Sequence, residues 1–256
     1  MAESFYVPDS EWFASTELTR GPWDRNAQHA GPPAALIGRA IEQLGGDKRV
    51  GSVSLDILRP VPITRLRVEA HVLRSGRSVE LVEASLSDEQ GELVHARAWR
   101  IAPGPEIEPV PGDPAPPGPA QSTEEPFFPI PWDVGYHSAM EWRFARGAFL
   151  EPGPATIWLR MRHPLVPGES PTPLQRVLIA ADTGNGASGP FDPSTHTFVN
   201  TDLSVHLFRA PEGEWVCLDA VSLNDAHGLG LAESALYDER GRVGRGAQTL
   251  LVRPRA

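Results

Sequence analysis

Apolar and polar positions follow two different periods along the chain. Between Pro32 and Glu42 the apolar residues recur at helical spacing, with prolines at the start and Gly45-Gly46 after the end. Proline suits the first helical turn and glycine the position after the last turn, so this stretch predicts a helix. The segments that follow alternate apolar and polar residues between turn-forming residues, which predicts strands. These strands are 53–59, 66–74, 79–88 and 93–101, and Trp12–Leu18 is a candidate first strand before the helix.

The same order of elements occurs again later in the chain. Shifted by 150 positions, the two ends align without a gap over about fifty residues, with Ser54 meeting Ser204 and Arg59 meeting Arg209. A match of this length predicts two copies of one structural unit. The second copy is expected to have its helix at 173–182 and four strands between Thr201 and Val252.

The two predicted helices align at an offset of 140 rather than 150, so that Glu42 meets Asp182. The second copy therefore has ten extra residues between its helix and its strands, around 183–198. Insertions fall in loops and often line functional sites. We expect this segment to form the rim of a site.

A proline-rich segment separates the copies. Residues 103–131 contain eleven prolines. Proline fixes φ and lacks a donor, so neither a helix nor an interior strand is expected there. The predicted division is an N-terminal unit 1–102, a linker 103–134 that joins the copies, and a C-terminal unit 135–256. A helix followed by antiparallel strands in each unit makes the predicted fold class α+β.

Composition narrows the classes of partner. The chain has 256 residues and a net charge of −10, which argues against nucleic acid or an anionic membrane surface as the main partner. Cys217 is the single cysteine, which suits a reducing compartment, and its apolar neighbours predict a packing role. The N-terminal residues lack the basic and apolar parts of a signal peptide, and no apolar run is long enough to span a bilayer. We expect a cytoplasmic protein without membrane insertion.

A glycine-rich run after the second predicted helix imitates a dinucleotide-binding fingerprint. Gly184, Gly186 and Gly189 have the GxGxxG spacing, but Pro190 and Pro193 follow at once. The fingerprint needs its last glycine to open a helix that holds a pyrophosphate. We therefore predict a loop and no cofactor. The histidines show neither HxH nor HExxH spacing, so no metal site is predicted.

Two polar residues fall on strand faces that are expected to be buried. Alternation places Thr201 on the face of Leu203, and Gln248 on the face of Leu250. A buried hydroxyl or amide needs a hydrogen-bond partner, and Asp182 at the end of the second helix is a candidate. The corresponding residues of the first copy are Gly51 and Ala98. We therefore expect one site per chain, between the copies.

Four stretches of the sequence resemble the acyl-CoA thioesterase II (TesB-like) family. They are Trp23 with Gln28-His29-Ala30-Gly31-Pro32-Pro33-Ala34-Ala35-Leu36, Leu55–Pro60, Asn200–Arg209 and Arg245–Gln248. The resemblance covers nearly the whole chain apart from the linker, and Ala30 departs from the glycine that many relatives have. It implies a double hotdog fold, in which two tandem units each wrap an antiparallel sheet around a helix. It also implies hydrolysis of fatty acyl-CoA to free fatty acid and CoA.

The resemblance implies roles for particular residues. Asp182, Thr201 and Gln248 would activate the attacking water, with Asp182 as the base. His29 and Gly31 lie at the entry of the first helix, where they are candidates for substrate contacts, although a surface loop position is the alternative for His29. Arg242 and Arg245 are candidates for the phosphates of CoA, and a solvated turn is the equal alternative.

Other functions are left open at this point. A hotdog hydratase or dehydratase would pair an acidic residue with a histidine, and neither Asp182 nor Glu42 has a histidine at an obvious spacing. A non-catalytic acyl-CoA binding module would bind without turnover. Ser204 lacks the context of a nucleophile elbow, which argues against a serine hydrolase. Acyl-CoA is the expected partner, and pairing into a homo-oligomer is left open.

Overall fold

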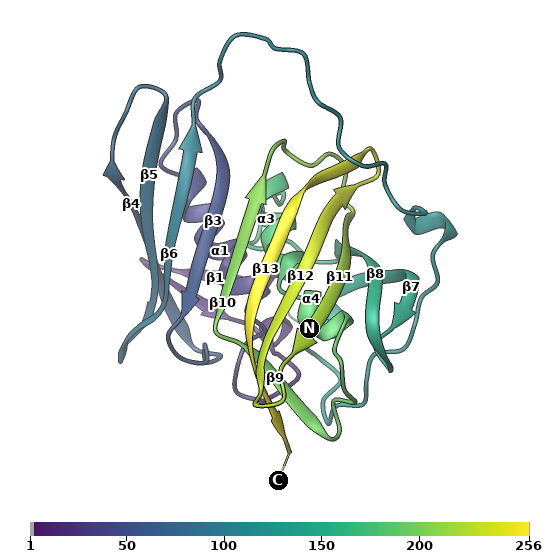
Figure 1. Ribbon diagram of the computed structural model, residues 1–256. Coiled ribbons are helices and arrows are strands. Elements are labelled where there is room, and N and C mark those ends of the chain that lie inside the picture. The colour runs from purple at the N-terminus through teal and green to yellow at the C-terminus, as the bar shows by residue number, and fades with distance from the viewer. Residues whose placement is uncertain (1–2, 256) are drawn as a thin grey trace.

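The computed structural model describes residues 3–255, and each copy contains a long helix and a meander of strands (Figure 1). The first copy consists of β1 (Tyr6–Asp9), β2 (Trp12–Ser15), η1 (Glu17–Thr19), α1 (Gly31–Glu42), β3 (Arg49–Ile57), β4 (Arg65–Arg74), β5 (Val79–Asp88) and β6 (Gly91–Ile101). After η2 (Pro119–Gln121), the second copy consists of α2 (Tyr136–Ala139), β7 (Met140–Ala148), β8 (Glu151–Met161), α3 (Pro173–Ala181), α4 (Gly184–Ala187), β9 (His196–Asn200), β10 (Asp202–Leu207), β11 (Val216–Asn224), β12 (Leu229–Asp238) and β13 (Gly241–Pro254).

These elements confirm both predicted helices and the strands that follow them, to within a few residues at each end. The candidate first strand is correct only up to Ser15, because the chain then turns into η1. Strands β1, β7, β8 and β9 were not predicted. None of the helices in residues 3–255 combines the length and the apolar character needed to cross a membrane.

The strands of both copies form one 13-stranded antiparallel sheet. Its order is β1-β2-β4-β5-β6-β3-β10-β13-β12-β11-β8-β7, and β9 pairs with β13. At the centre, β3 pairs with β10 so that Ser54 lies opposite Ser204, its repeat counterpart. The hydroxyls of these two serines are 3.3 Å apart. Because counterparts face each other only where a two-fold axis crosses an antiparallel pair, the two copies are related by a pseudo-two-fold axis at this point.

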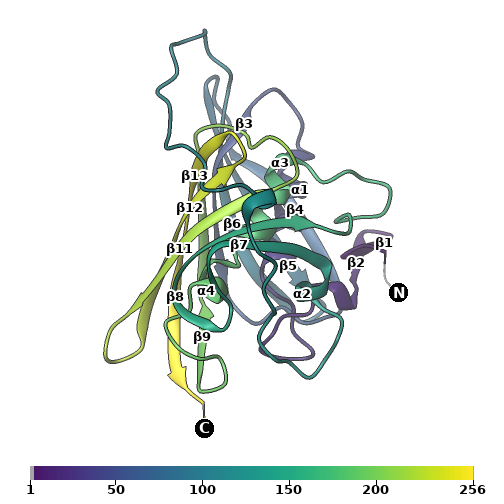
Figure 2. The same cartoon turned by 90° about the vertical axis from the view of Figure 1, so that its right-hand side faces the viewer.

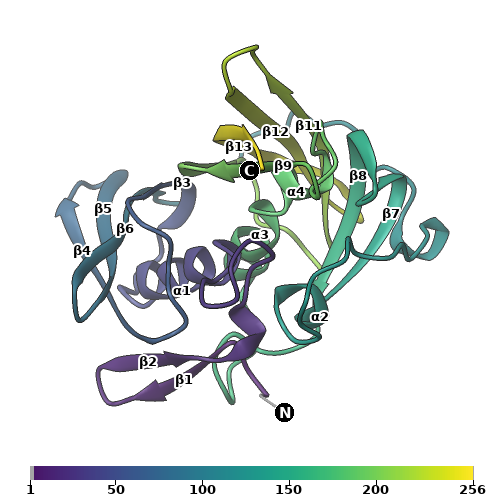
Figure 3. The same ribbon diagram turned by 90° about the horizontal axis from the view of Figure 1, so that it is seen from below.

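Helices α1 and α3 pack against each other on the concave side of the sheet (Figures 2 and 3). Their close approach depends on glycine, since a Cβ on Gly31 would overlap the carbonyl oxygen of Ile179. At the other end, the Glu42 carboxylate accepts a hydrogen bond of 2.8 Å from the Thr172 hydroxyl at the N-terminus of α3. The helices are therefore antiparallel. This packing brings the end of α3 to the beginning of α1.

Between β6 and η2 the linker is extended, as predicted, and passes above the ends of the central strands (Figure 1), whereas η2 is a helical turn where no helix was predicted. The last part of the linker, however, belongs to the core. Phe128 is 6% exposed, and Phe127 packs on Trp142 and Phe149 with ring centroids 5.2 and 4.9 Å apart. Describing residues 103–134 only as a connection was therefore wrong for this end, while the predicted domain division stays a prediction.

Candidate active site

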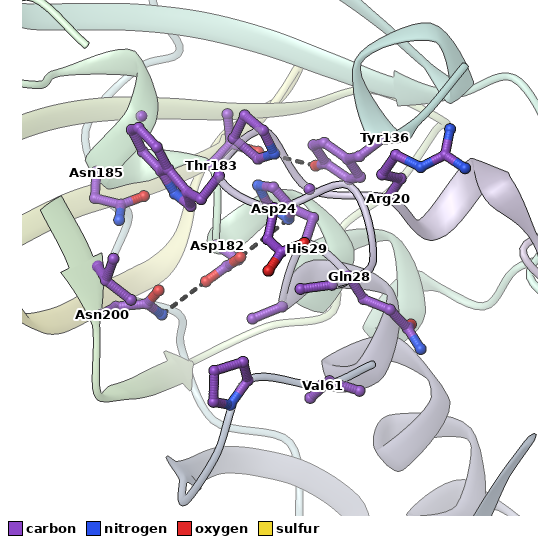
Figure 4. Close-up of a pocket in the computed structure, with 18 of the residues that line it drawn as sticks. Arg20, Asp24, Gln28, His29, Val61, Tyr136, Asp182, Thr183, Asn185 and Asn200 are labelled. Carbon is purple, nitrogen blue, oxygen red and sulfur yellow. Dashed lines mark hydrogen bonds and ion pairs between the residues drawn. The ribbon is translucent and has the colours of Figure 1, made fainter. Parts of the chain in front are cut away.

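A cavity of about 360 Å³ lies where the end of α3 meets the beginning of α1 (Figure 4). Both copies and the linker contribute to its walls. Its aromatic side chains are Trp23, Phe127, Phe128, Tyr136, Trp142 and Phe149. Its polar side chains include His29, Asp182, Thr183, Asn185, Asn200 and Thr201. An apolar enclosure with a few converging polar groups is typical of a ligand site.

Asp182 is the buried acidic group of this cavity. It follows the last residue of α3 and is 3% exposed. Its Oδ1 accepts hydrogen bonds from Asn200 Nδ2 at 2.8 Å and from Gln248 Nε2 at 3.0 Å. Two amide donors on one oxygen compensate for part of the cost of burying a carboxylate. They also hold the carboxylate in one orientation.

Gln248 holds the Asp182 carboxylate in place through a hydrogen bond. It is 2% exposed, so its predicted buried position on β13 is confirmed. Its Oε1 accepts a hydrogen bond of 3.2 Å from the backbone N–H of Asn185, and its Nε2 is used by Asp182. Both ends of the amide are thus satisfied, which fixes its orientation. Gln248 therefore acts on the cavity through Asp182.

His29 faces the second oxygen of Asp182. Its Nδ1 is 3.0 Å from Asp182 Oδ2, and the N–H of Gly31 approaches the same Nδ1 at 3.1 Å. The imidazole stacks on the ring of Tyr136, with centroids 3.8 Å apart and planes 6° from parallel. No histidine stands at an obvious spacing from Asp182 in the sequence, and the structure supplies one from the first copy. The antiparallel packing of α1 and α3 brings the two residues together.

Tyr136 is itself held in place. Its hydroxyl donates to the carbonyl of Ile179 at 2.8 Å and accepts from the Thr183 hydroxyl at 2.8 Å. Burial raises the pKa of Tyr136, and the nearby charge of Asp182 raises it further, against the lowering effect of Thr183. The phenol therefore remains neutral and serves as a fixed platform for His29.

Thr201 does not lie where the alternation predicted. It occupies the bend between β9 and β10, its side chain is exposed, and its hydroxyl donates to the carbonyl of Thr249 at 3.4 Å. Alternation holds only within a continuous strand, and the bend changes its phase before Leu203. Thr201 lines the cavity wall, but the side chain that bonds Asp182 is that of the preceding residue, Asn200.

The two arginines proposed for CoA phosphates do not reach this cavity. Arg242 pairs with Asp113 of the linker at 3.0 Å. Arg245 is exposed on β13, three residues from the buried Gln248 and on the opposite face of the sheet. The structure thus favours the alternative of a solvated surface position for both.

Arg59 and Arg209, which align in the repeat, form equivalent ion pairs in the two copies. Arg209 Nη2 bonds Asp238 Oδ1 at 2.6 Å, and the counterpart Arg59 lies 3.6 Å from Asp88. Burial raises the pKa of Asp238, but hydrogen bonds from Arg209 and two backbone N–H groups outweigh it and lower the pKa overall. Each pair ties the end of one strand to the turn of a neighbouring hairpin.

The first copy has a cavity at the equivalent place but not the polar residues. A more open cavity of about 980 Å³ flanks Glu42, the counterpart of Asp182. The Glu42 carboxylate accepts hydrogen bonds from the side chains of Thr172 and Gln175, which form the capping box of α3, so it serves to hold the two helices together. Glycine and alanine stand at positions 51 and 98. The polar set is therefore found in one of the two copies.

The segment after α3 does line the cavity, through Thr183, Asn185 and Gly186. The loop predicted for the GxGxxG run was wrong over its first four residues, which form the short helix α4, but no helix begins at Gly189, as expected. Cys217 is fully buried beside Trp158 and Tyr237, and burial raises the pKa of its thiol, which confirms a packing role.

Some residues of the site were not predicted from the sequence. Asn200 stood beside Thr201 in a stretch already singled out, so its amide could have been considered. Tyr136, Phe127 and Phe128 lie in or next to the proline-rich linker, and only the tertiary structure brings them to Asp182.

Two tandem units that share one sheet, each with a helix on its concave side, define a double hotdog protein of the α+β class. The model of the acyl-CoA thioesterase N-terminal domain matches residues 19–101, and that of the C-terminal domain matches residues 111–252. The chain therefore belongs to the acyl-CoA thioesterase family, and it is a thioester hydrolase.

Solved structures share the fold over nearly the whole chain. A hot dog fold protein of unknown function from Alicyclobacillus acidocaldarius has a TM-score of 0.75 at 15% identity, covering 98% of this chain and 96% of its own. The tesB protein of Mycobacterium avium subs paratuberculosis has a TM-score of 0.70 at 18% identity, with coverages of 95% and 93%. The acyl-CoA thioesterase II TesB2 of Mycobacterium marinum has a TM-score of 0.68 at 15% identity, with coverages of 93% and 96%. The search of curated proteins found no match.

Proposed function

We propose that this protein hydrolyses fatty acyl-CoA to free fatty acid and CoA, with water activated at Asp182. The observation that carries this proposal is a buried carboxylate, oriented by two amides, at the wall of a largely aromatic cavity. Membership of the acyl-CoA thioesterase family supports the substrate class. No metal or cofactor takes part in the proposed reaction.

In the proposed mechanism Asp182 takes a proton from water as the water oxygen attacks the thioester carbonyl. The C–S bond then breaks, the acyl group leaves as the acid, and a proton passes to the sulfur of CoA. Positioned acid–base groups of this kind typically contribute about 100-fold or more to the rate. Gln248 and Asn200 position Asp182, and Thr201 contacts the water or the substrate from the cavity wall.

The aromatic part of the cavity is the proposed acyl site. Phe127 and Phe128 come from the linker, while Trp142 and Phe149 come from β7 and the turn after it. Their stacked and edge-on rings form a continuous apolar wall. Burying an acyl chain there gains about 0.8 kcal/mol per methylene group.

A hydratase or dehydratase remains the second candidate because of one observation. The contact between His29 and Asp182 is the acid–histidine pairing that such enzymes need. The family match favours hydrolysis, which releases a free thiol, whereas hydration of an enoyl thioester does not. One assay therefore separates the two reactions.

The test is thiol release from acyl-CoA substrates ranging from acetyl-CoA to palmitoyl-CoA, with an enoyl-CoA followed in parallel. Asp182→Asn should lower thiol release at least about 100-fold, because the base is lost. Glu42→Gln, the change at the counterpart position, should retain activity. Enoyl hydration without thiol release would replace the proposal by the second candidate. Unchanged hydrolysis in Asp182→Asn would show that the site lies elsewhere.

A further inference from the structure

We propose that His29 and Asp182 share one proton between Nδ1 and Oδ2 and act as a single acid–base unit, in which His29 is the positioning residue. This inference rests on the proposed function at Asp182, and it deepens it by naming the group that controls the protonation of the base. It changes the role of His29, which the sequence suggested only as a contact for the substrate.

The carboxylate of Asp182 is surrounded by polar partners. Oδ1 of Asp182 already accepts two amide hydrogen bonds, from Asn200 and Gln248. Oδ2 is 3.0 Å from Nδ1 of His29. A contact at this distance is favourable when the two atoms hold a proton and repulsive when both are unprotonated, which supports a shared proton. A carboxylate offers about four acceptor positions, and three are then occupied. The remaining position, on Oδ2, is available to the attacking water.

The neighbours of the pair favour opposite locations for the proton. The N–H of Gly31 approaches Nδ1 at 3.1 Å, which favours an unprotonated Nδ1 and therefore a proton on Oδ2. The amide donors on Oδ1 stabilise the charged carboxylate, which favours the proton on Nδ1. Each of the two locations of the proton is therefore supported by a neighbouring group. The proton can then follow the charge that develops during the reaction.

The ring of His29 is held rigidly in place. The imidazole is 13% exposed and stacked on Tyr136, whose hydroxyl is held by Ile179 and Thr183. His29 therefore cannot turn away when the proton moves. Fixed geometry is what makes such a pair effective, because no reorganisation is needed during the step.

The proton balance is simple. In the resting state one proton lies between Nδ1 and Oδ2, and Nε2 of His29 carries a second proton that does not move. When the water attacks, its O–H bond breaks, and Nδ1 and Oδ2 together hold two protons. When the C–S bond breaks, one proton returns to the sulfur of CoA, and the resting state is restored. The pair thus serves first as base and then as acid.

The test is the pH dependence of kcat/KM for thiol release in wild type, His29→Asn and His29→Phe. A coupled pair gives a profile with two limbs, which belong to the pair as a whole. His29→Asn places an amide near the position of Nδ1 and cannot titrate. We expect it to lose about 10-fold in rate and one of the two limbs. His29→Phe keeps the stacking on Tyr136 without the polar contact and should lose about 100-fold.

The other titratable and charged groups that face the cavity are Arg20, Asp24, Arg59, Tyr136 and His137. Burial lowers the pKa of His137, while a hydrogen bond and the charge of Asp133 oppose this. His137 is therefore the competing source of a limb, and His137→Asn is the matched control. The pH profile of His137→Asn should keep both limbs, even if the variant is slower than wild type.

A measurement on the resting protein is independent of turnover. In ¹⁵N-histidine NMR, the Nδ1 signal of His29 should shift when Asp182 is changed to Asn, because the shared proton is lost. Identical pH profiles in wild type and His29→Asn, or an Nδ1 signal unaffected by Asp182→Asn, would overturn the inference. Loss of activity in Asp182→Asn together with either of those results would leave the proposed function in place. Thermal melts of each variant check that it is folded.

Discussion

Gln248 Nε2 donates a hydrogen bond of 3.0 Å to Asp182 Oδ1 across 66 positions of sequence. The other end of the same amide accepts from the N–H of Asn185. Gln248 therefore links β13, the end of α3 and the beginning of α4 at the point where the cavity has its carboxylate. Each of the predictions on activity depends on the orientation that this link gives to Asp182.

Replacing Gln248 by Leu should lower kcat at least about 100-fold, because Asp182 then turns away from its working orientation. The buried N–H of Asn185 would lose its partner, so the free energy of unfolding should also fall, by about 1–3 kcal/mol. Thiol release and urea unfolding measure the two effects. Thr249→Ala, on the exposed face of the same strand, is the control. Full activity in Gln248→Leu would refute the positioning role.

Asn200→Ala should reduce kcat by about 10- to 100-fold, since a hydrogen bond to a charged group typically contributes 1.5–3 kcal/mol. Thr201→Ala should cost less, because Thr201 is exposed and bonds only a backbone carbonyl. Measuring kcat and KM for both variants separates the residue implied by the family resemblance from its neighbour. A larger loss of kcat in Thr201→Ala would favour the residue implied by the resemblance.

Phe149→Leu should shift the preferred acyl chain towards longer substrates. Phe149 is 5% exposed and packs against Phe127 and Trp142 in the cavity wall, with centroids 4.9 and 5.0 Å apart. A smaller side chain leaves room for about one or two more methylene groups, each worth about 0.8 kcal/mol. The measurement is kcat/KM across saturated acyl-CoA substrates. An unchanged preference would mean that the chain binds along another wall.

Asp238 should make the fold sensitive to acid. Its pKa is lowered in the folded protein, so its contribution to stability is present above the ordinary pKa of an aspartate and is lost as the pH falls through the folded value. Asp238→Asn should destabilise the protein by about 2–4 kcal/mol at neutral pH. The free energy of unfolding of the variant should also fall less steeply than that of wild type as the pH is lowered. Unfolding midpoints followed from pH 7 into the acid range test this. A parallel pair of curves for wild type and variant would contradict it.

Much of the fold follows from local sequence. Prolines at the start and glycines after the end mark α1, and two prolines within the first turns predict its start correctly. The repeat itself predicted that two copies would meet, and the pairing of Ser54 with Ser204 is the direct consequence of that symmetry. Gln248 could be predicted as buried because β13 is continuous around it and its alternation holds.

Which side chains from different elements contact each other was decided only by the tertiary structure. Thr201 was misplaced because a bend interrupts the alternation two residues before Leu203. His29 was missed as the partner of Asp182 because their contact depends on how closely α1 and α3 approach, which glycine at position 31 permits. Sequence pattern determines which face of an element is buried, since burial depends on local period. The distance between two side chains from different elements depends on packing, and packing decided the composition of this site.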